Sequence, residues 1–145
     1  MVHVGAGIVG GIALAEHDGE VEIFLASMNQ HVVWVYSPEG KLLRQWGKQA
    51  TQQEIEAGTG GAFAQIVHCI AMSRAGLIYV CDRQGQRVQV FDKSGTFVRN
   101  IWVKTGTPTL PDPRGTAWWI AFSRDPEQTF MYVMNGRNEQ LHVLD

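Results

Sequence analysis

The sequence has 145 residues, a formal net charge of −2, 45% hydrophobic residues and 18% charged residues. These values are typical of one globular domain. The near-neutral charge gives no indication of a nucleic-acid-binding protein, because such proteins carry basic patches that contact phosphates. No apolar run is long enough to span a bilayer, and no signal peptide led by Lys or Arg is present, so no membrane role is expected and the compartment stays open.

A glycine motif lies near the start of the chain. Gly5-x-Gly7-x-x-Gly10 has the spacing of a dinucleotide-binding turn, in which residues 12–17 would form a helix and residues 21–25 a second strand. Against this interpretation, the helix would be short, the second strand ends without an acidic residue to bind a ribose, and no further alternation of strands and helices follows. A dinucleotide enzyme therefore remains only a weak alternative.

The competing interpretation divides residues 10–47 into four short strands. Its turns are residues 16–19, a short stretch before His31, and Ser37-Pro38-Glu39-Gly40, which has Gly in the last position of a turn. Residues 48–66 follow as a long connection rich in Gln and Gly. This connection is not strand-like, residues 52–57 being suited to a helical turn, and such loops often carry function.

Residues 67–103 contain the most regular copy of the same pattern. Apolar runs at 68–73, 77–82, 87–92 and 96–102 are separated by turn signals that contain Gly76, Gly85 and Gly95. Four strands in about 35 residues form the unit of a β-propeller blade.

This copy also resembles the NHL repeat. The match is carried by an apolar strand, an Asp, a turn, an Arg-Val-Gln-Val-Phe run and a Gly turn: Tyr79, Val80, Asp82, Arg87, Val88, Val90, Phe91 and Gly95. The resemblance implies a propeller of the six-bladed type, similar to peptidyl-hydroxyglycine amidating lyases and gluconolactonase-like enzymes. It implies no particular chemistry, because propellers host many functions. Members of this family are often exported.

A third copy ends the chain. Residues 104–116, rich in Pro and Gly, form a second connection, and residues 117–145 match the first three strands of the repeat without the fourth. The predicted fold is therefore all-β: a partial β-propeller with about three four-stranded antiparallel blades. Because an open arc leaves apolar end faces bare, we expect a fragment of a longer propeller, whose missing blades close the ring, or self-association of several chains.

Two cysteines occupy related positions in the second copy. If the turn at 74–76 pairs Ser73 with Leu77, the same register places Cys69 opposite Cys81. Two adjacent buried thiols and a disulfide are both compatible with this pairing, and an oxidising compartment favours the bond.

His68 is the main candidate for chemistry. Propeller sites surround the central channel, at the start of each innermost strand, and in the three copies that position holds Gly10, His68 and Trp118. The resemblance to amidating lyases, which place metal-ligating His residues there, implies that His68 is a metal ligand. A divalent metal needs several ligands, however, and Gly10 and Trp118 offer none. The alternative is a structural His at the channel mouth.

Four further residues are ligand or channel candidates. Asp82 is either a channel acid or a carboxylate that binds turn amides. Its equivalents in the other copies are Ser27 and Asn135, both of turn-capping type, which favours the second role. Trp118 and Trp119 form either a stacking platform for a sugar or aromatic ligand or a filler between blades.

Two main functions therefore compete. The first is a binding or scaffold module that presents residues 48–66 and 103–116 to a protein or small-molecule ligand, with no cofactor. The second is part of a metal-dependent lactonase or amidating-lyase-like enzyme in which His68 lines the channel. Additional His, Glu or Asn residues at the equivalent positions of further blades would favour the enzyme.

Overall fold

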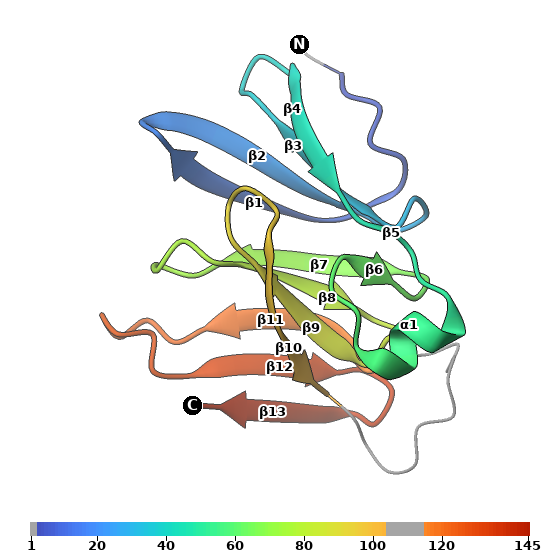
Figure 1. Ribbon diagram of the computed structural model, residues 1–145. Helices are drawn as coiled ribbons and strands as arrows, with labels where there is room; N and C mark the ends of the chain where they lie inside the picture. Colours follow the sequence, from blue (N-terminus) through green and yellow to red (C-terminus); the bar gives the residue numbers. More distant parts are fainter. Residues whose placement is uncertain (1–2, 104–114) are drawn as a thin grey trace.

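The computed structural model of the protein describes residues 3–103 and 115–145. It contains three antiparallel sheets that lie side by side, which we call blades 1, 2 and 3 in chain order (Figure 1). Blade 1 consists of β1 (Val9–His17), β2 (Glu20–Ser27), β3 (Val32–Tyr36) and β4 (Leu42–Trp46). Blade 2 consists of β7 (Val67–Met72), β8 (Ile78–Asp82), β9 (Arg87–Phe91) and β10 (Phe97–Trp102). Blade 3 consists of β11 (Ala117–Phe122), β12 (Met131–Asn135) and β13 (Gln140–Leu144).

Within each blade the strands follow one another as a meander, as the sequence predicts. The first strands of the blades, β1, β7 and β11, lie next to one another and form the inner edge of the arc (Figure 1). Close approach of β1 to β7 depends on Gly10 and Gly11, because a Cβ at either position would collide with the backbone of His68, Cys69 or Ile70. The all-β, partial-propeller prediction is confirmed.

The first strand excludes the dinucleotide interpretation. Val9–His17 is a nine-residue strand, where the glycine motif requires a helix. It turns directly into β2 through Asp18 and Gly19, which have φ angles of 52° and 79° and so allow the tight two-residue hairpin. A nucleotide fingerprint needs a strand, a tight turn and a helix in parallel topology, and this segment provides an antiparallel hairpin instead. The hypothesis based on Gly5, Gly7 and Gly10 is wrong.

The connection between blades 1 and 2 is more ordered than the sequence indicated. It contains the expected helical turn, α1 (Gln52–Ala57), but also two short parallel strands, β5 (Lys48–Gln49) and β6 (Ala62–Phe63). The prediction that residues 48–66 are not strand-like is therefore wrong at these four residues. The reason is tertiary: β6 is buried between the blades, with Phe63 fully inaccessible, and such contacts override local propensity.

Alternating side chains pack the blades against each other in two interfaces. The first joint, between blades 1 and 2, buries side chains that include Phe24, Val33, Phe63, Ile78 and Phe91. The second joint, between blades 2 and 3, buries Cys69, Tyr79, Val90, Ile120 and Val133 among others. The alternation places successive residues of a strand in different joints, so both faces of blade 2 are covered.

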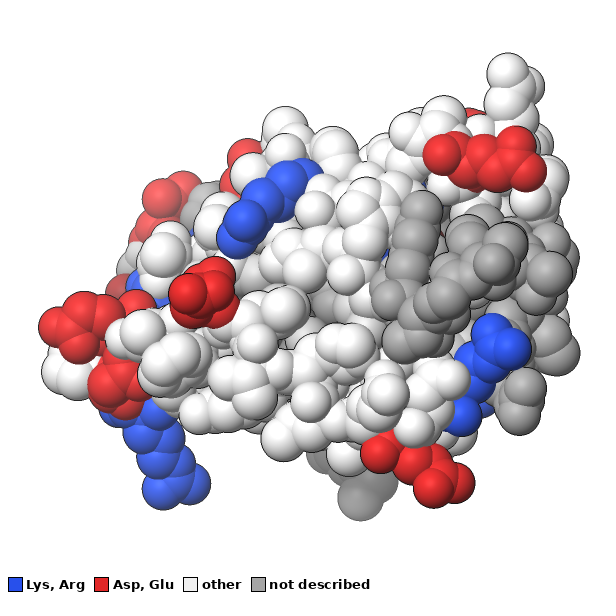
Figure 2. Space-filling model, turned by 90° about the horizontal axis from the view of Figure 1, so that it is seen from below, with Lys and Arg blue, Asp and Glu red and all other residues white. Residues whose placement is uncertain are grey.

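Blades 1 and 3 each have one open face, as expected for an arc. Leu141 and Val143 of β13 are 64% and 56% exposed, whereas their equivalents in blade 2, Val88 and Val90, are fully buried. Figure 2 views the molecule from the blade 3 end, and charged side chains gather mainly toward the edges of that view. None of the helices in residues 3–103 and 115–145 combines the length and apolar character of a membrane span. Whether the open faces drive self-association stays a prediction.

Candidate functional site: the start of the inner strands

The structure brings together the three positions that the repeat alignment places at the start of the inner strands. Nδ1 of His68 lies 2.7 Å from the backbone oxygen of Trp118, and the two rings are 5.9 Å apart. On the other side of β7, Gly10 lies against the backbone oxygen of His68, where a Cβ has no room. Of these three positions, two bring side chains to this point, His68 and Trp118, because the third must be a glycine.

The contact with Trp118 determines the chemistry of the His68 ring. A backbone oxygen only accepts hydrogen bonds, so Nδ1 must carry the proton and donate it. In the neutral ring, Nε2 then holds a lone pair. None of the described residues forms a hydrogen bond with this nitrogen, which is not fully buried. His68 is half-buried, so its backbone-anchored ring offers one oriented acceptor.

Arg83 belongs to the same cluster, although the sequence reasoning did not select it. Its guanidinium carbon lies 4.2 Å from the centre of the Trp118 ring, a cation–π distance. The indole nitrogen of Trp118 donates to the oxygen of Gly115 at 3.1 Å, which fixes the ring. Burial lowers the pKa of Arg83. The available signal was its position: Arg83 directly follows Asp82, the last residue of β8.

Asp82 lies away from any channel. Its side chain is completely buried and forms an ion pair with the equally buried Arg87, with 2.8 Å between Oδ2 and Nε. Oδ1 accepts from the backbone N–H of Ala64 at 2.9 Å, and Gln89 donates to Oδ2 at 3.1 Å. The channel-acid role is therefore incorrect. The turn-amide role is also wrong in detail, because the amide it binds comes from the inter-blade connection.

Asn135 has the local role that its residue type indicated. It is fully buried, accepts from the Asn138 side chain at 3.0 Å and lies 3.2 Å from Nε2 of His142. These contacts hold the turn between β12 and β13 in place. Asn135 is therefore a turn residue, and it also lines the hollow beside Trp118, so its role as a ligand candidate stays a prediction.

Trp118 and Trp119 point to different surroundings, because they are consecutive in a strand. Trp118 lies beside His68 and lines a hollow of about 540 Å³ with Met134, Gly136 and Leu141. Trp119 is 52% exposed on the open face of blade 3. The two rings do not act as one platform, and Trp118 is the member that belongs to the site.

Cys69 and Cys81 are joined in a disulfide, with their Cα atoms 4.9 Å apart. The register follows the predicted pairing, with Ser73 bonded to Leu77 and Ile70 opposite Val80. Both cysteines are buried in the second joint. The pair lies directly after His68 in the chain and fixes β7 to β8.

A metal centre finds little support in these residues. Among residues 3–103 and 115–145, no group of three or more His, Cys, Asp and Glu side chains is placed to hold a metal ion. One imidazole alone does not satisfy the four to eight ligands that a divalent ion requires. The residues present therefore do not fit a complete metal site.

The comparisons with known proteins agree with this architecture. A search of the solved structures finds propellers described as a streptogramin B lyase (12% identity, TM-score 0.53) and as a selenomethionine-substituted virginiamycin B lyase from Staphylococcus aureus (10% identity, TM-score 0.51). Each alignment covers 94% of this chain, but only 40% and 41% of the respective solved chain. At this identity the likeness shows the fold alone, and the chain spans about two fifths of these structures' length.

The fold and these neighbours define the protein as a partial β-propeller. The family model of the NHL repeat matches residues 65–91, which run from the end of the first connection to the end of β9. The repeat that carries His68 is therefore the part of the chain that is similar to the NHL family, within a partial β-propeller fold. No curated protein sequence matched the chain.

Proposed function

We propose that the protein is a ligand-binding propeller segment and that a small ring-bearing molecule binds at His68, Arg83 and Trp118. The observation that carries the proposal is the orientation of His68. Its Nδ1 is anchored on the backbone oxygen of Trp118, so that Nε2 can accept a hydrogen bond from a ligand hydroxyl or amide.

The other two residues supply affinity of a different kind. The indole of Trp118 offers apolar ring surface, on which sugars and aromatic rings stack, and Arg83 adds a positive charge at the same ring. Trp118 also lines a hollow of about 540 Å³, the size of a small-molecule site, whose other lining residues come from β12, β13 and the turn between them rather than from His68 or Arg83. This combination favours a ring that carries a hydroxyl group, and an anionic substituent would gain further from Arg83.

The test is ligand-observed saturation-transfer NMR on the full chain with 4-hydroxybenzoate and methyl β-D-glucopyranoside, and with acetate as the ringless control. We expect a signal from at least one ring-bearing probe and none from acetate. The signal should disappear in Trp118→Ala, weaken in His68→Gln and persist in Trp119→Ala, which removes the neighbouring exposed ring. The absence of a signal from both ring-bearing probes, or a signal that Trp118→Ala leaves unchanged, would refute the site.

A metal-dependent lyase or lactonase is the second candidate. One observation favours it: a His that donates Nδ1–H to a backbone oxygen and presents Nε2 has the second-shell arrangement of a metal ligand. Two solved propellers of similar fold are described as lyases. The described residues supply one ligand, so blades outside this chain would have to supply the others.

If the protein is a binding module, the chain should bind metal ions only weakly. Titration with Mn²⁺ should broaden the His68 ring signals only at millimolar concentrations, because a single imidazole is a poor site. Micromolar binding centred on His68 would instead favour the enzyme over the binding module.

A further inference from the structure

The open face of blade 1 contains a hollow. The equivalent surface of blade 2 lies inside the molecule, in the first joint, where it is covered by side chains. The hollow has a volume of about 230 Å³, and its lining is mainly apolar: Val4, Ile12, Ile23, Leu25, Tyr36, Ser37, Pro38 and Gly40. Ile12 is 61% exposed there. From this hollow we infer a binding site for a tryptophan side chain presented by the outer strand of a partner blade.

Strand register shows which surface of blade 2 is equivalent. In blade 1, Ile12 pairs with Leu25, and Ile23 pairs with Tyr36. In blade 2, Ile70 pairs with Val80, and Ile78 pairs with Phe91, in the same strands and order. These four residues of blade 2 are 0–7% exposed in the first joint. The same apolar surface, which we call the bed, therefore occurs twice: it is covered in blade 2 and open in blade 1.

The turn beside the bed is equivalent as well. The backbone N–H of the first turn residue, Ser37 in blade 1 and Asp92 in blade 2, donates to the backbone oxygen four residues later. The N–H of the turn glycine, Gly40 or Gly95, donates to the backbone oxygen of that first residue. Both glycines have positive φ, 84° and 95°. The floor of the hollow thus has the backbone shape of its filled counterpart.

In blade 2, the bed is occupied by Trp46 from the outer strand of blade 1. The Trp46 ring lies 5.6 Å from the ring of Phe91, and a Cβ on Gly95 would lie only 2.7 Å from it. Tyr36 and Gly40 hold these two positions in the hollow of blade 1. The packing of Trp46 in blade 2 therefore shows that an indole fits an apolar surface of this shape.

The chain segment that borders the bed repeats too. Ile8 accepts from Met28 N and donates to the Asn29 side chain, just as Ile66 accepts from Arg83 N and donates to the Gln84 side chain. Ala6 is buried on blade 1, as Ala64 is on blade 2. Residues 3–8 thus follow the path of residues 61–66, which flank the Trp46 site. The occupant we expect is a strand that carries Trp in the manner of β4.

The test uses two synthetic peptides with the full chain labelled at its methyl groups. One has the sequence of residues 41–47 and contains the indole, and the other carries Trp46→Ile, the residue found at the equivalent position of β10. We expect saturable shifts of the Ile12, Ile23 and Leu25 methyl groups with the first peptide, in the millimolar range, and at least about tenfold weaker binding of the second, because it lacks the large aromatic surface. N-acetyl-tryptophanamide should shift the same methyl groups.

Two variants locate the site. Ile12→Trp fills the hollow from the protein side at an exposed position and should abolish the shifts, whereas Leu141→Trp, equally exposed on the opposite end face, should leave them unchanged. Circular dichroism checks that both variants fold. Shifts that spread over both end faces, equal binding of the two peptides, or no saturable shift would each overturn the inference.

Discussion

The two joints between the blades have the same backbone plan but are filled in different ways. The first joint is aromatic: the Trp46 ring contacts Phe24 and Phe91, and Phe63 enters from the connection. Among the described residues, no strand equivalent to β6 enters the second joint. Instead it contains the Cys69–Cys81 disulfide and the edge-to-face pair of Tyr79 and Phe122, 4.9 Å apart.

The difference follows from side-chain volume at equivalent positions. In blade 1 the inner strands have Gly11 and Ala26 on the side of the first joint, which leaves space for large aromatic rings. At the two equivalent positions blade 2 has Cys69 and Cys81, which fill the corresponding space in the second joint. Different residues can therefore fill a blade interface, provided that they are apolar and that their volumes complement one another.

The largest effect should come from the buried ion pair under the first connection. Asp82→Ala leaves Arg87 charged and without its main partner in a site that water does not reach, so we expect a loss of about 3–5 kcal/mol in the free energy of unfolding. Urea denaturation measures it. The double variant Asp82→Leu/Arg87→Met should recover most of this loss, since it removes both charges. A single variant within about 1 kcal/mol of wild type would show that the pair is not buried.

Loss of the disulfide should have the next largest effect on stability. Because the disulfide lies in the second joint, its removal should destabilise that joint more than the first. The bond closes a loop with a sequence separation of 12, and loops of this length contribute about 3 kcal/mol by restricting the unfolded chain. Reduction should lower the melting temperature and weaken hydrogen-exchange protection in β7 and β11 more than in β1. The double variant Cys69→Ala/Cys81→Ala should melt at the same temperature with and without reductant. Equal loss of protection in β1 would contradict the assignment.

The sequence was sufficient for the fold because local signals agreed with it. Gly and Pro turns separate alternating strands, and the turn at 74–76 determined the register that opposes Cys69 and Cys81. The same repeat alignment predicted that His68 and the Trp118 position meet. Long-range burial was not visible: the turn at 83–86 places Asp82 opposite Arg87, but nothing local indicates that this pair is buried beneath residues 61–64, or that Phe63 enters the first joint.

A smaller loss of stability is expected from removing the N-cap of α1, the helix in the connection between blades 1 and 2. Thr51 caps α1: its hydroxyl accepts from Glu54 N, and the Glu54 carboxylate accepts from Thr51 N. Thr51→Ala should cost about 1 kcal/mol, measured by urea denaturation. Thr51→Ser keeps the hydroxyl and should be close to wild type. A similar loss in both variants would point to the methyl group rather than the cap.

The same helix has a pH dependence of known sign. The hydrogen bond from Lys48 and those from Thr51 hold the pKa of Glu54 at about 2. Because the pKa is lowered in the folded protein, the stabilisation is present above the ordinary pKa of Glu and is lost as the pH falls from about 4.5 toward 2. The Glu54→Gln variant should show a flatter stability profile over that range.

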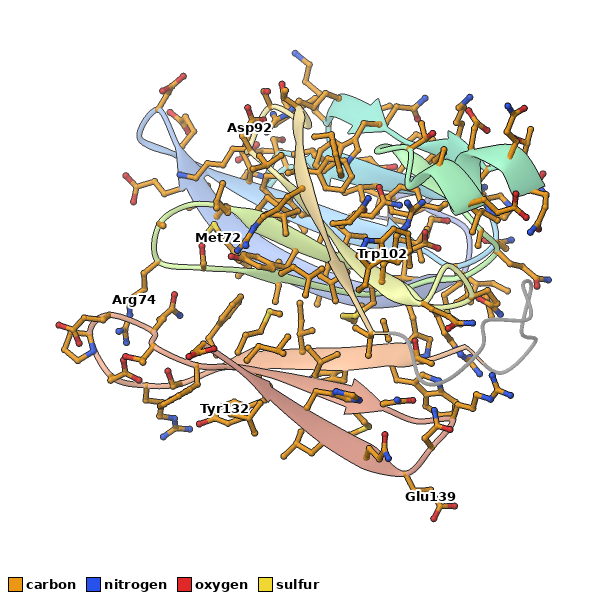
Figure 3. All side chains as sticks on the ribbon, turned by 60° about the horizontal axis from the view of Figure 1, so that its bottom comes forward. Met72, Arg74, Asp92, Trp102, Tyr132 and Glu139 are labelled. Atoms are coloured by element: carbon orange, nitrogen blue, oxygen red, sulfur yellow. A yellow bond between two sulfur atoms is a disulfide. The ribbon has the colours of Figure 1, made fainter. Side chains whose placement is uncertain are left out.

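The smallest effect is expected at the rim of the second joint. Arg74, in the turn between β7 and β8, reaches the hairpin of blade 3, where its guanidinium donates to the backbone oxygens of Arg124 and Asp125 (Figure 3). These contacts are exposed, and water replaces them readily, so Arg74→Ala should cost less than about 1 kcal/mol by urea denaturation. Arg74→Lys, which keeps the charge but not the forked geometry, should lose a similar amount, because the guanidinium spans two oxygens. A larger cost would mean that the second joint depends on its rim, and the volume argument would then fail for this joint.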